Sequence, residues 1–65
     1  MKNNLKQARL NKGLTQIELS QRLSMTERNI RYLEKGETLP RLDVALKMTL
    51  ELTDTYDVTK LWVVK

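Results

Sequence analysis

The stretch from residue 28 to residue 35 brings together side chains that suit recognition of an anionic or hydrogen-bonding surface, namely Arg28, Arg31, Tyr32 and Lys35. At about 100° per residue on a helix, three of them share one face and Arg31 lies on its flank, while Ile30 and Leu33 point the other way. A guanidinium group forms two parallel hydrogen bonds with a planar acceptor. On an isolated helix, however, such a face would more often be simply solvated. The elements around it decide between these two interpretations.

Two capped helical segments provide that context. Thr15 and Glu18 have the spacing of a capping box, in which the hydroxyl and the carboxylate each accept a backbone N–H. Thr26 is a second N-cap candidate, and Gly36 can close the helix that follows it. The pattern predicts two helices separated by a short turn, over residues 16–23 and 27–35. Such a pair is typical of the helix-turn-helix of DNA-binding proteins, so we interpret the cationic face as a nucleic-acid contact.

Further helices are predicted on either side of this pair. Asn3 or Asn4 can cap a first helix that ends near residue 11, before Gly13. Pro40 suits the first helical position of a fourth helix that runs to about residue 52. The residues of this helix predicted to face the core are Leu42, Ala45, Leu46, Thr49 and Leu52.

Composition and charge narrow the range of functions. The 65-residue chain has a net charge of +4, contains neither Cys nor His, and has only two Gly. Disulfides, zinc sites and a Gly-rich phosphate loop are therefore excluded. Residues 1–41 carry nine Lys/Arg against four Asp/Glu, which is +5, whereas residues 42–65 carry three against four, which is −1. The excess positive charge lies with the two-helix unit and favours nucleic acid over a membrane surface as the partner.

The same composition sets expectations for activity and location. We expect no enzymatic activity, because His and Cys are absent and the carboxylates lie at helix starts or in loops. No cofactor, no metal and no small-molecule ligand are expected either. No apolar run has the length of a membrane span or a signal sequence, so a cytoplasmic protein without membrane association is predicted. We expect a single domain over residues 1–65, with a small core that depends on local helix signals.

An ordered set of residues resembles the Cro/CI-type (XRE) helix-turn-helix family of bacterial and phage regulators. The matching positions extend over most of the chain and are Arg9, Gly13, Leu14, Thr15, Gln16, Glu18, Leu19, Leu23, Thr26, Ile30, Leu33, Glu34, Lys35, Gly36 and Pro40. The resemblance implies an all-α, compact, five-helix, lambda-repressor-like domain that inserts its third helix into the DNA major groove. Residues 58–62 resemble the short fifth helix, and the last three residues are expected to form a tail or a short strand.

The resemblance and the helix geometry together assign roles to individual residues. We expect bases to be contacted from the start and outer face of the third helix, by Thr26, Glu27, Arg28, Arg31 and Tyr32. Phosphates are expected to be bound at the two ends of that helix, by Gln16, Lys35 and Arg41. The family further implies a partly buried ion pair between Arg9 and Glu34 that joins the first helix to the third.

The leading hypothesis is a sequence-specific DNA-binding transcriptional regulator, a small repressor of phage or mobile-element type. It would bind a palindromic operator as a homodimer, because one helical face reads too few base pairs to single out a site. We expect the dimer interface at the β-favouring chain end and a nearby leucine, formed by Leu50, Leu61, Trp62, Val63 and Val64. The alternative is an antitoxin or modulator that acts mainly by binding a partner protein, and a weaker one is an architectural protein that bends DNA.

Overall fold

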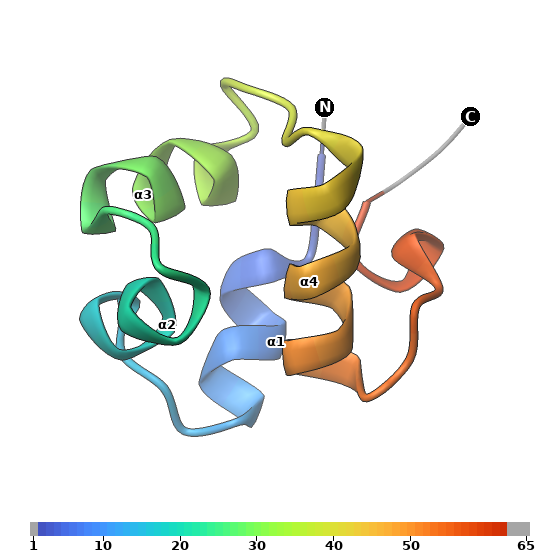
Figure 1. Ribbon diagram of the computed structural model, residues 1–65, viewed down its shortest axis with the longest axis horizontal. Coiled ribbons are helices and arrows are strands. Elements are labelled where there is room, and N and C mark those ends of the chain that lie inside the picture. Colours follow the sequence, from blue (N-terminus) through green and yellow to red (C-terminus); the bar gives the residue numbers. More distant parts are fainter. Residues whose placement is uncertain (1, 63–65) are drawn as a thin grey trace.

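The protein, described here by a computed structural model over residues 2–62, consists of helices and connecting turns (Figure 1). Its elements in chain order are α1 (Leu5–Asn11), α2 (Gln16–Leu23), α3 (Glu27–Lys35), α4 (Leu42–Thr53) and the 3₁₀ turn η1 (Val58–Lys60). The predicted limits of α2 and α3 are confirmed to the residue. Within residues 2–62, every helix is too short or too polar to traverse a lipid bilayer.

The capping signals explain why α2 and α3 begin and end where they do. The Thr15 hydroxyl accepts the Glu18 N–H at 3.0 Å, and the Glu18 carboxylate accepts the Thr15 N–H at 3.0 Å. Hydrogen bonds from Thr15, first from its backbone and then from its side chain, lower the pKa of the Glu18 carboxyl. Thr26 caps α3 by accepting the Asn29 N–H at 3.1 Å. The start of each of these two helices is therefore fixed by a threonine side chain that accepts the backbone N–H three residues later.

The helix ends depend on left-handed residues. Gly36 closes α3 at φ 77°, a conformation that glycine adopts without steric cost. Ser24 closes α2 at φ 54°, so the turn between α2 and α3 keeps its left-handed geometry although a serine occupies the position. A non-glycine residue there costs on the order of 1 kcal/mol. The tight turn is retained at the expense of some local strain.

The core lies where α1 and α4 meet the inner faces of α2 and α3. Its buried apolar residues come from the four α-helices and from the segments before α2 and after η1: Leu5, Leu14, Leu19, Ile30, Leu33, Ala45, Met48, Leu52, Leu61 and Trp62. In Figure 1, α2 and α3 lie at one end of the longest axis, η1 lies at the other, and α1 and α4 lie between them. Burial of this set is the main favourable term that holds α3 against the rest of the molecule.

The start of α4 differs from the sequence-based prediction. The helix begins at Leu42, with Arg41 rather than Pro40 directly before it, and Arg41 makes no side-chain capping hydrogen bond. Leu42, predicted to face the core, is 72% exposed, because at the first position of the helix it projects beyond the packed interior. The core-facing residues of α4 include Met48, which is fully buried and was not predicted.

The expected fifth helix is a single 3₁₀ turn. Asp57 begins it by accepting the Thr59 N–H at 3.1 Å, and the Thr59 side chain and backbone lower the pKa of the Asp57 carboxyl. After three residues the chain leaves the turn and joins Asn3 through an antiparallel bridge at Trp62. The Asn4 N–H donates to the Leu61 carbonyl at 2.7 Å, which pulls this segment out of helical geometry. The expected tail or strand at residues 63–65 lies outside the described residues.

Candidate nucleic-acid interface

The outer face of α3 presents an arginine held by a tyrosine. The Arg28 Nε donates to the Tyr32 hydroxyl at 3.3 Å, and the Arg28 Cζ lies 5.7 Å from the centre of the Tyr32 ring. This contact combines a long hydrogen bond with a cation–π interaction one helical turn apart. Because only Nε is engaged by the hydroxyl, the two terminal nitrogens of Arg28 still point donors at solvent. They have the fork geometry that matches the O6 and N7 acceptors of guanine.

A second pair on the same helix is an ion pair between an acidic and a basic side chain. The Arg31 Nη2 lies 3.0 Å from the Glu27 Oε1, and both side chains keep a large exposed fraction, 50% and 38%. The pair has the i, i+4 spacing at which helix side chains meet. Thr26, at the N-cap of α3, uses its hydroxyl to accept the Asn29 N–H. Asn29 is also exposed on this helix, and the sequence analysis did not include it among the candidate DNA-contacting residues.

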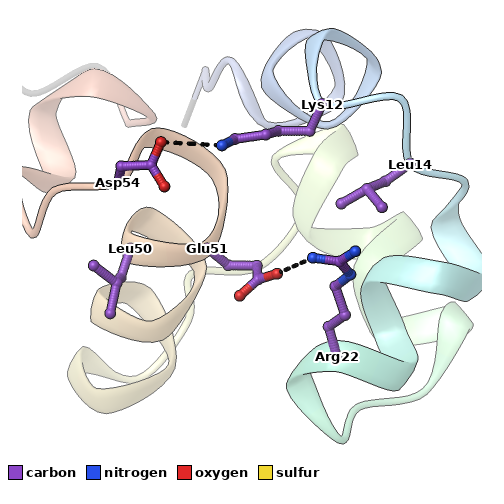
Figure 2. Close-up of a pocket in the computed structure, with 6 residues that line it drawn as sticks. All are labelled: Lys12, Leu14, Arg22, Leu50, Glu51 and Asp54. Carbon is purple, nitrogen blue, oxygen red and sulfur yellow. Dashed lines mark hydrogen bonds and ion pairs between the residues drawn. The ribbon is translucent and has the colours of Figure 1, made fainter.

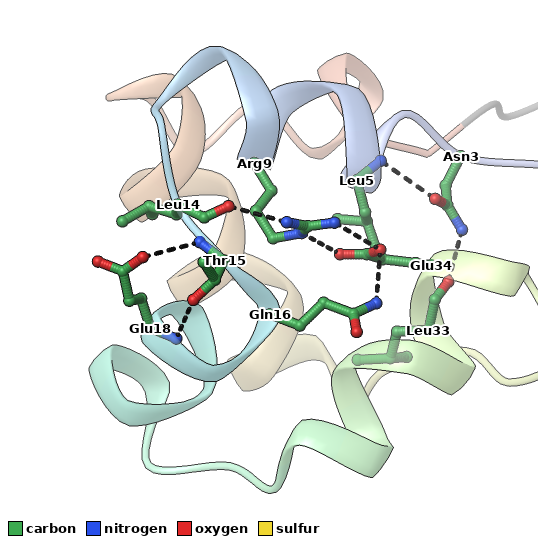
Figure 3. A network of polar contacts seen from close by, with 9 residues as sticks. All are labelled: Asn3, Leu5, Arg9, Leu14, Thr15, Gln16, Glu18, Leu33 and Glu34. Carbon is green, nitrogen blue, oxygen red and sulfur yellow. Dashed lines mark hydrogen bonds and ion pairs between the residues drawn. The ribbon is translucent and has the colours of Figure 1, made fainter.

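The inner face of α3 carries the ion pair that the family resemblance implied, and Figure 3 shows its surroundings. The Arg9 Nε lies 2.6 Å from the Glu34 Oε2, and the two side chains are only 7% and 5% exposed. A longer bond of 3.3 Å joins the Arg9 Nη2 to the Glu34 Oε1, and the Arg9 Nη1 donates to the Leu14 carbonyl at 2.8 Å. One guanidinium therefore ties α1, the start of the α2 segment and α3 together.

Gln16, expected to bind phosphate, belongs to this network. Its Nε2 donates to the Glu34 Oε1 at 3.1 Å, and the residue is half-buried at the first position of α2 (Figure 3). Its side chain therefore points toward the ion pair. An anion at this end of α2 would therefore be bound by the backbone N–H groups of the first turn rather than by the Gln16 side chain as it lies here.

The two other expected phosphate-binding residues lie at the C-terminal end of α3 and after it. Lys35 is the last residue of the helix and is exposed. Arg41 is exposed at the start of α4, with its Nε 3.6 Å from the Asp43 Oδ1. An exposed pair at this distance contributes little to stability and leaves the guanidinium free to turn toward another anion.

Asn3 is a positioning residue whose role exceeds the capping function that the sequence suggested. Its Oδ1 accepts the Leu5 N–H at 3.1 Å, and its Nδ2 donates to the Leu33 carbonyl at 2.7 Å. The same amide thus begins α1 and holds the last turn of α3 (Figure 3). Spacing alone could not reveal the second bond, because it joins residues 30 positions apart.

The residues expected at a dimer interface are not brought together on one exposed surface. Leu61 and Trp62 are 1% and 5% exposed within the chain, whereas Leu50 is 40% exposed on α4. Val63 and Val64 lie outside the described residues. Figure 2 shows Leu50 beside a polar hollow crossed by two ion pairs, Lys12 with Asp54 at 3.1 Å and Arg22 with Glu51 at 2.6 Å. Leu50 therefore lies in a charged setting.

Comparison with known proteins agrees with this geometry. A family model described as helix-turn-helix matches residues 5–52, which include α1, α2, α3 and most of α4. No match was found among curated proteins. The matched region contains the capped pair α2–α3, the Arg9–Glu34 ion pair and the outward cationic face of α3. The chain therefore belongs to the Cro/CI-type (XRE) helix-turn-helix family of DNA-binding regulators.

Proposed function

We propose that the protein is a transcriptional repressor that binds a palindromic operator as a homodimer. The observation that carries this proposal is the division of α3 into two faces. Its inner face is anchored by Ile30, Leu33 and the buried carboxylate of Glu34, while its outer face presents exposed hydrogen-bond donors. A rigidly held helix with free donors on its outer side is what reading of base edges requires.

Base reading is assigned to the first two turns of α3. Arg28 is the reader of a guanine, because its Nε is held by Tyr32 and its terminal nitrogens have no hydrogen-bond partner within residues 2–62. Arg31 and Glu27 read neighbouring positions, Arg31 as a donor and Glu27 as an acceptor from a cytosine amino group. Thr26 and the Tyr32 ring complete the surface. Either of them can make an apolar contact with a thymine methyl group.

Phosphates are assigned to both ends of this surface. Lys35 and Arg41 would contact one strand beyond the end of α3, and the start of α2 at Gln16 would contact the other. Such contacts fix the register of the helix on the duplex but carry no sequence information. A protein bound in this way over a promoter would block the polymerase, which is the basis for assigning repression.

The experiment that tests the proposal is selection of binding sites from random duplexes by the full chain. We expect an enriched inverted repeat whose half-sites are separated by about one helical turn, with a conserved guanine in each half. A reporter carrying that repeat across its promoter should be silenced when the protein is expressed. If no sequence is enriched and retention on DNA is uniform, the protein is not a sequence-specific repressor, and the protein-binding alternative is favoured.

A further inference from the structure

The carbonyl of Leu33, in the last turn of α3, receives hydrogen bonds from two separate parts of the chain. The Gly36 N–H donates to it at 3.1 Å, and the Glu37 N–H donates to the Tyr32 carbonyl at 3.2 Å, as is usual where a left-handed glycine ends a helix. The Asn3 Nδ2 adds a bond of 2.7 Å to the same Leu33 carbonyl (Figure 3). Unlike the bonds from Gly36 and Glu37, this one ties the end of α3 to a distant segment.

Asn3 is itself held in place, so its amide acts from a fixed point. Its Oδ1 accepts the Leu5 N–H at 3.1 Å, and its backbone forms an antiparallel bridge with Trp62. The neighbouring Asn4 N–H donates to the Leu61 carbonyl at 2.7 Å. Leu61 and Trp62 are both buried, so the segment that positions Asn3 belongs to the core. The amide is therefore preorganised for its bond to the end of α3.

The other anchors of α3 act through inward-pointing side chains. Ile30 and Leu33 are buried in the core, and the Glu34 carboxylate is bound by Arg9. None of these contacts involves the carbonyl groups of the last turn, which are the groups that open first when a helix end frays. The Asn3 amide acts directly on one of those carbonyls.

We propose that Asn3 raises the affinity of the protein for DNA by keeping the last turn of α3 closed. Lys35, the last residue of that turn, is exposed two positions after Leu33, so the direction of its side chain follows the backbone that Asn3 holds. The inference rests on the proposed function, in which Lys35 contacts a phosphate. Asn3 is then a positioning residue for phosphate binding, acting through the end of α3.

The substitution Asn3→Asp separates the two roles of this side chain. The carboxylate keeps an oxygen that can accept the Leu5 N–H at the start of α1, where negative charge is favourable. It has no N–H to donate, and it places negative charge beside the carbonyl end of α3. Asn3→Ser is a neutral second variant with a shorter side chain. Asn4→Asp is the matched control, because it adds the same charge on an exposed neighbour that makes no capping hydrogen bond.

The first measurement is the slope of log affinity against log salt concentration on a random duplex. Both Asn3 variants should bind about two- to tenfold more weakly, the range that corresponds to one hydrogen bond. They should also lower the slope by about one unit, as expected for one lost phosphate contact, whereas Asn4→Asp should leave the slope unchanged. A purely structural role of Asn3 would not alter the slope, because nearly every molecule is folded well below the melting temperature.

A double substitution tests whether the effect passes through Lys35. In the unchanged chain, Lys35→Ala should lower the slope by about one unit, whereas in Asn3→Asp it should lower the slope no further. A full additional unit lost in the double variant would overturn the proposal, since Asn3 and Lys35 would then act independently. An unchanged slope in both Asn3 variants would do the same.

The second measurement needs no DNA. Amide hydrogen exchange at Gly36 and Glu37 should be faster in the two Asn3 variants than in Asn4→Asp, while exchange at Ile30 in the first half of α3 stays the same. Equal exchange in the Asn3 and Asn4 variants would overturn the proposal. Failure of the chain to select any operator, with the slope change on random duplex intact, would instead count against the repressor function and support the role of Asn3.

Discussion

The two faces of α3 carry the same kind of charge pair in opposite surroundings. On the inner face, Arg9 and Glu34 lie 2.6 Å apart with side chains 7% and 5% exposed. On the outer face, Arg31 and Glu27 lie 3.0 Å apart with side chains 50% and 38% exposed. Both are Arg–Glu ion pairs, but the difference in burial changes the free-energy cost of losing one partner. Removing one partner of the buried pair would leave an uncompensated charge in the interior, whereas each partner of the exposed pair can exchange the other for water or for a nucleotide at little cost.

This comparison explains how one short helix can serve both the fold and the DNA recognition that we propose for its outer face. The carboxylate of Glu34 also receives the Gln16 amide, so its position is fixed by three side-chain hydrogen bonds from two other segments. Nothing comparable restrains the carboxylate of Glu27, whose described side-chain bond is to its own helix. The inner face therefore sets where α3 lies, and the outer face remains adjustable when a duplex is met.

The largest expected effect follows from breaking the inner pair. Glu34→Ala leaves the Arg9 guanidinium buried and without its carboxylate, which costs about 3–5 kcal/mol. A domain of this size has a total stability of only about 3–10 kcal/mol. We therefore expect Glu34→Ala to lower the midpoint of urea unfolding sharply or to abolish the folded state at 37 °C, as followed by circular dichroism.

The control for this prediction is the outer pair. Glu27→Ala should change the free energy of unfolding by about 1 kcal/mol or less, because both partners remain hydrated. A double change of Arg9→Met with Glu34→Leu should restore much of the stability, since neither buried charge remains. If Glu27→Ala proved as destabilising as Glu34→Ala, the distinction between the two faces would fail.

The next effect concerns the outer face alone. Arg28→Ala should weaken binding to the selected operator by about 1–3 kcal/mol and relax the preference at one base position, while unfolding stays unchanged. Lys35→Ala is the matched comparison, because it should weaken binding to all duplexes alike and lower the salt slope by about one unit. Titrations on specific and random DNA at several salt concentrations separate the two. Equal losses for Arg28→Ala on both duplexes would remove Arg28 from the base-reading group.

The smallest effect is a pH dependence that originates at the start of α2. Because the folded-state pKa of Glu18 lies below its ordinary value of 4.5, the carboxylate stabilises the fold above that value. The stabilisation is lost as the pH falls through the lowered pKa. Glu18→Gln removes this titration, so its melting temperature should fall less than that of the unchanged chain between about pH 6 and pH 3. Parallel curves for the two proteins would show that the capping box contributes no such linkage.

The sequence predicted α2 and α3 well because their limits depend on local chemistry. Thr15, Thr26 and Gly36 act on backbone groups a few residues away, so their effect can be read without knowing the fold. Ser24 is the instructive exception. It adopts the left-handed conformation that a glycine would favour, since the packing of α2 against α3 requires the same turn whichever residue occupies it.

The second half of the chain was predicted less well because its geometry depends on distant contacts. Helical spacing places Leu42 on the same side of α4 as Ala45. Burial also requires packing partners from other elements, and Leu42 at the first position of the helix projects beyond the core. The 3₁₀ turn at Val58–Lys60 is short because the following residues bond to the N-terminal segment. The outward face of α3 could be assigned by periodicity, whereas the inward turn of Gln16 could not.

The bridge between Asn3 and Trp62 also bears on the order in which the molecule assembles. It closes a loop that spans nearly the whole chain, so its entropic cost is the greatest of the backbone contacts and we expect it to form late. The capped pair α2–α3 needs only short loops and should form early. Because Asn3 also holds the Leu33 carbonyl, parting of the two chain ends would loosen the final turn of α3. We therefore expect the last step of folding to be the one that fixes the end of α3.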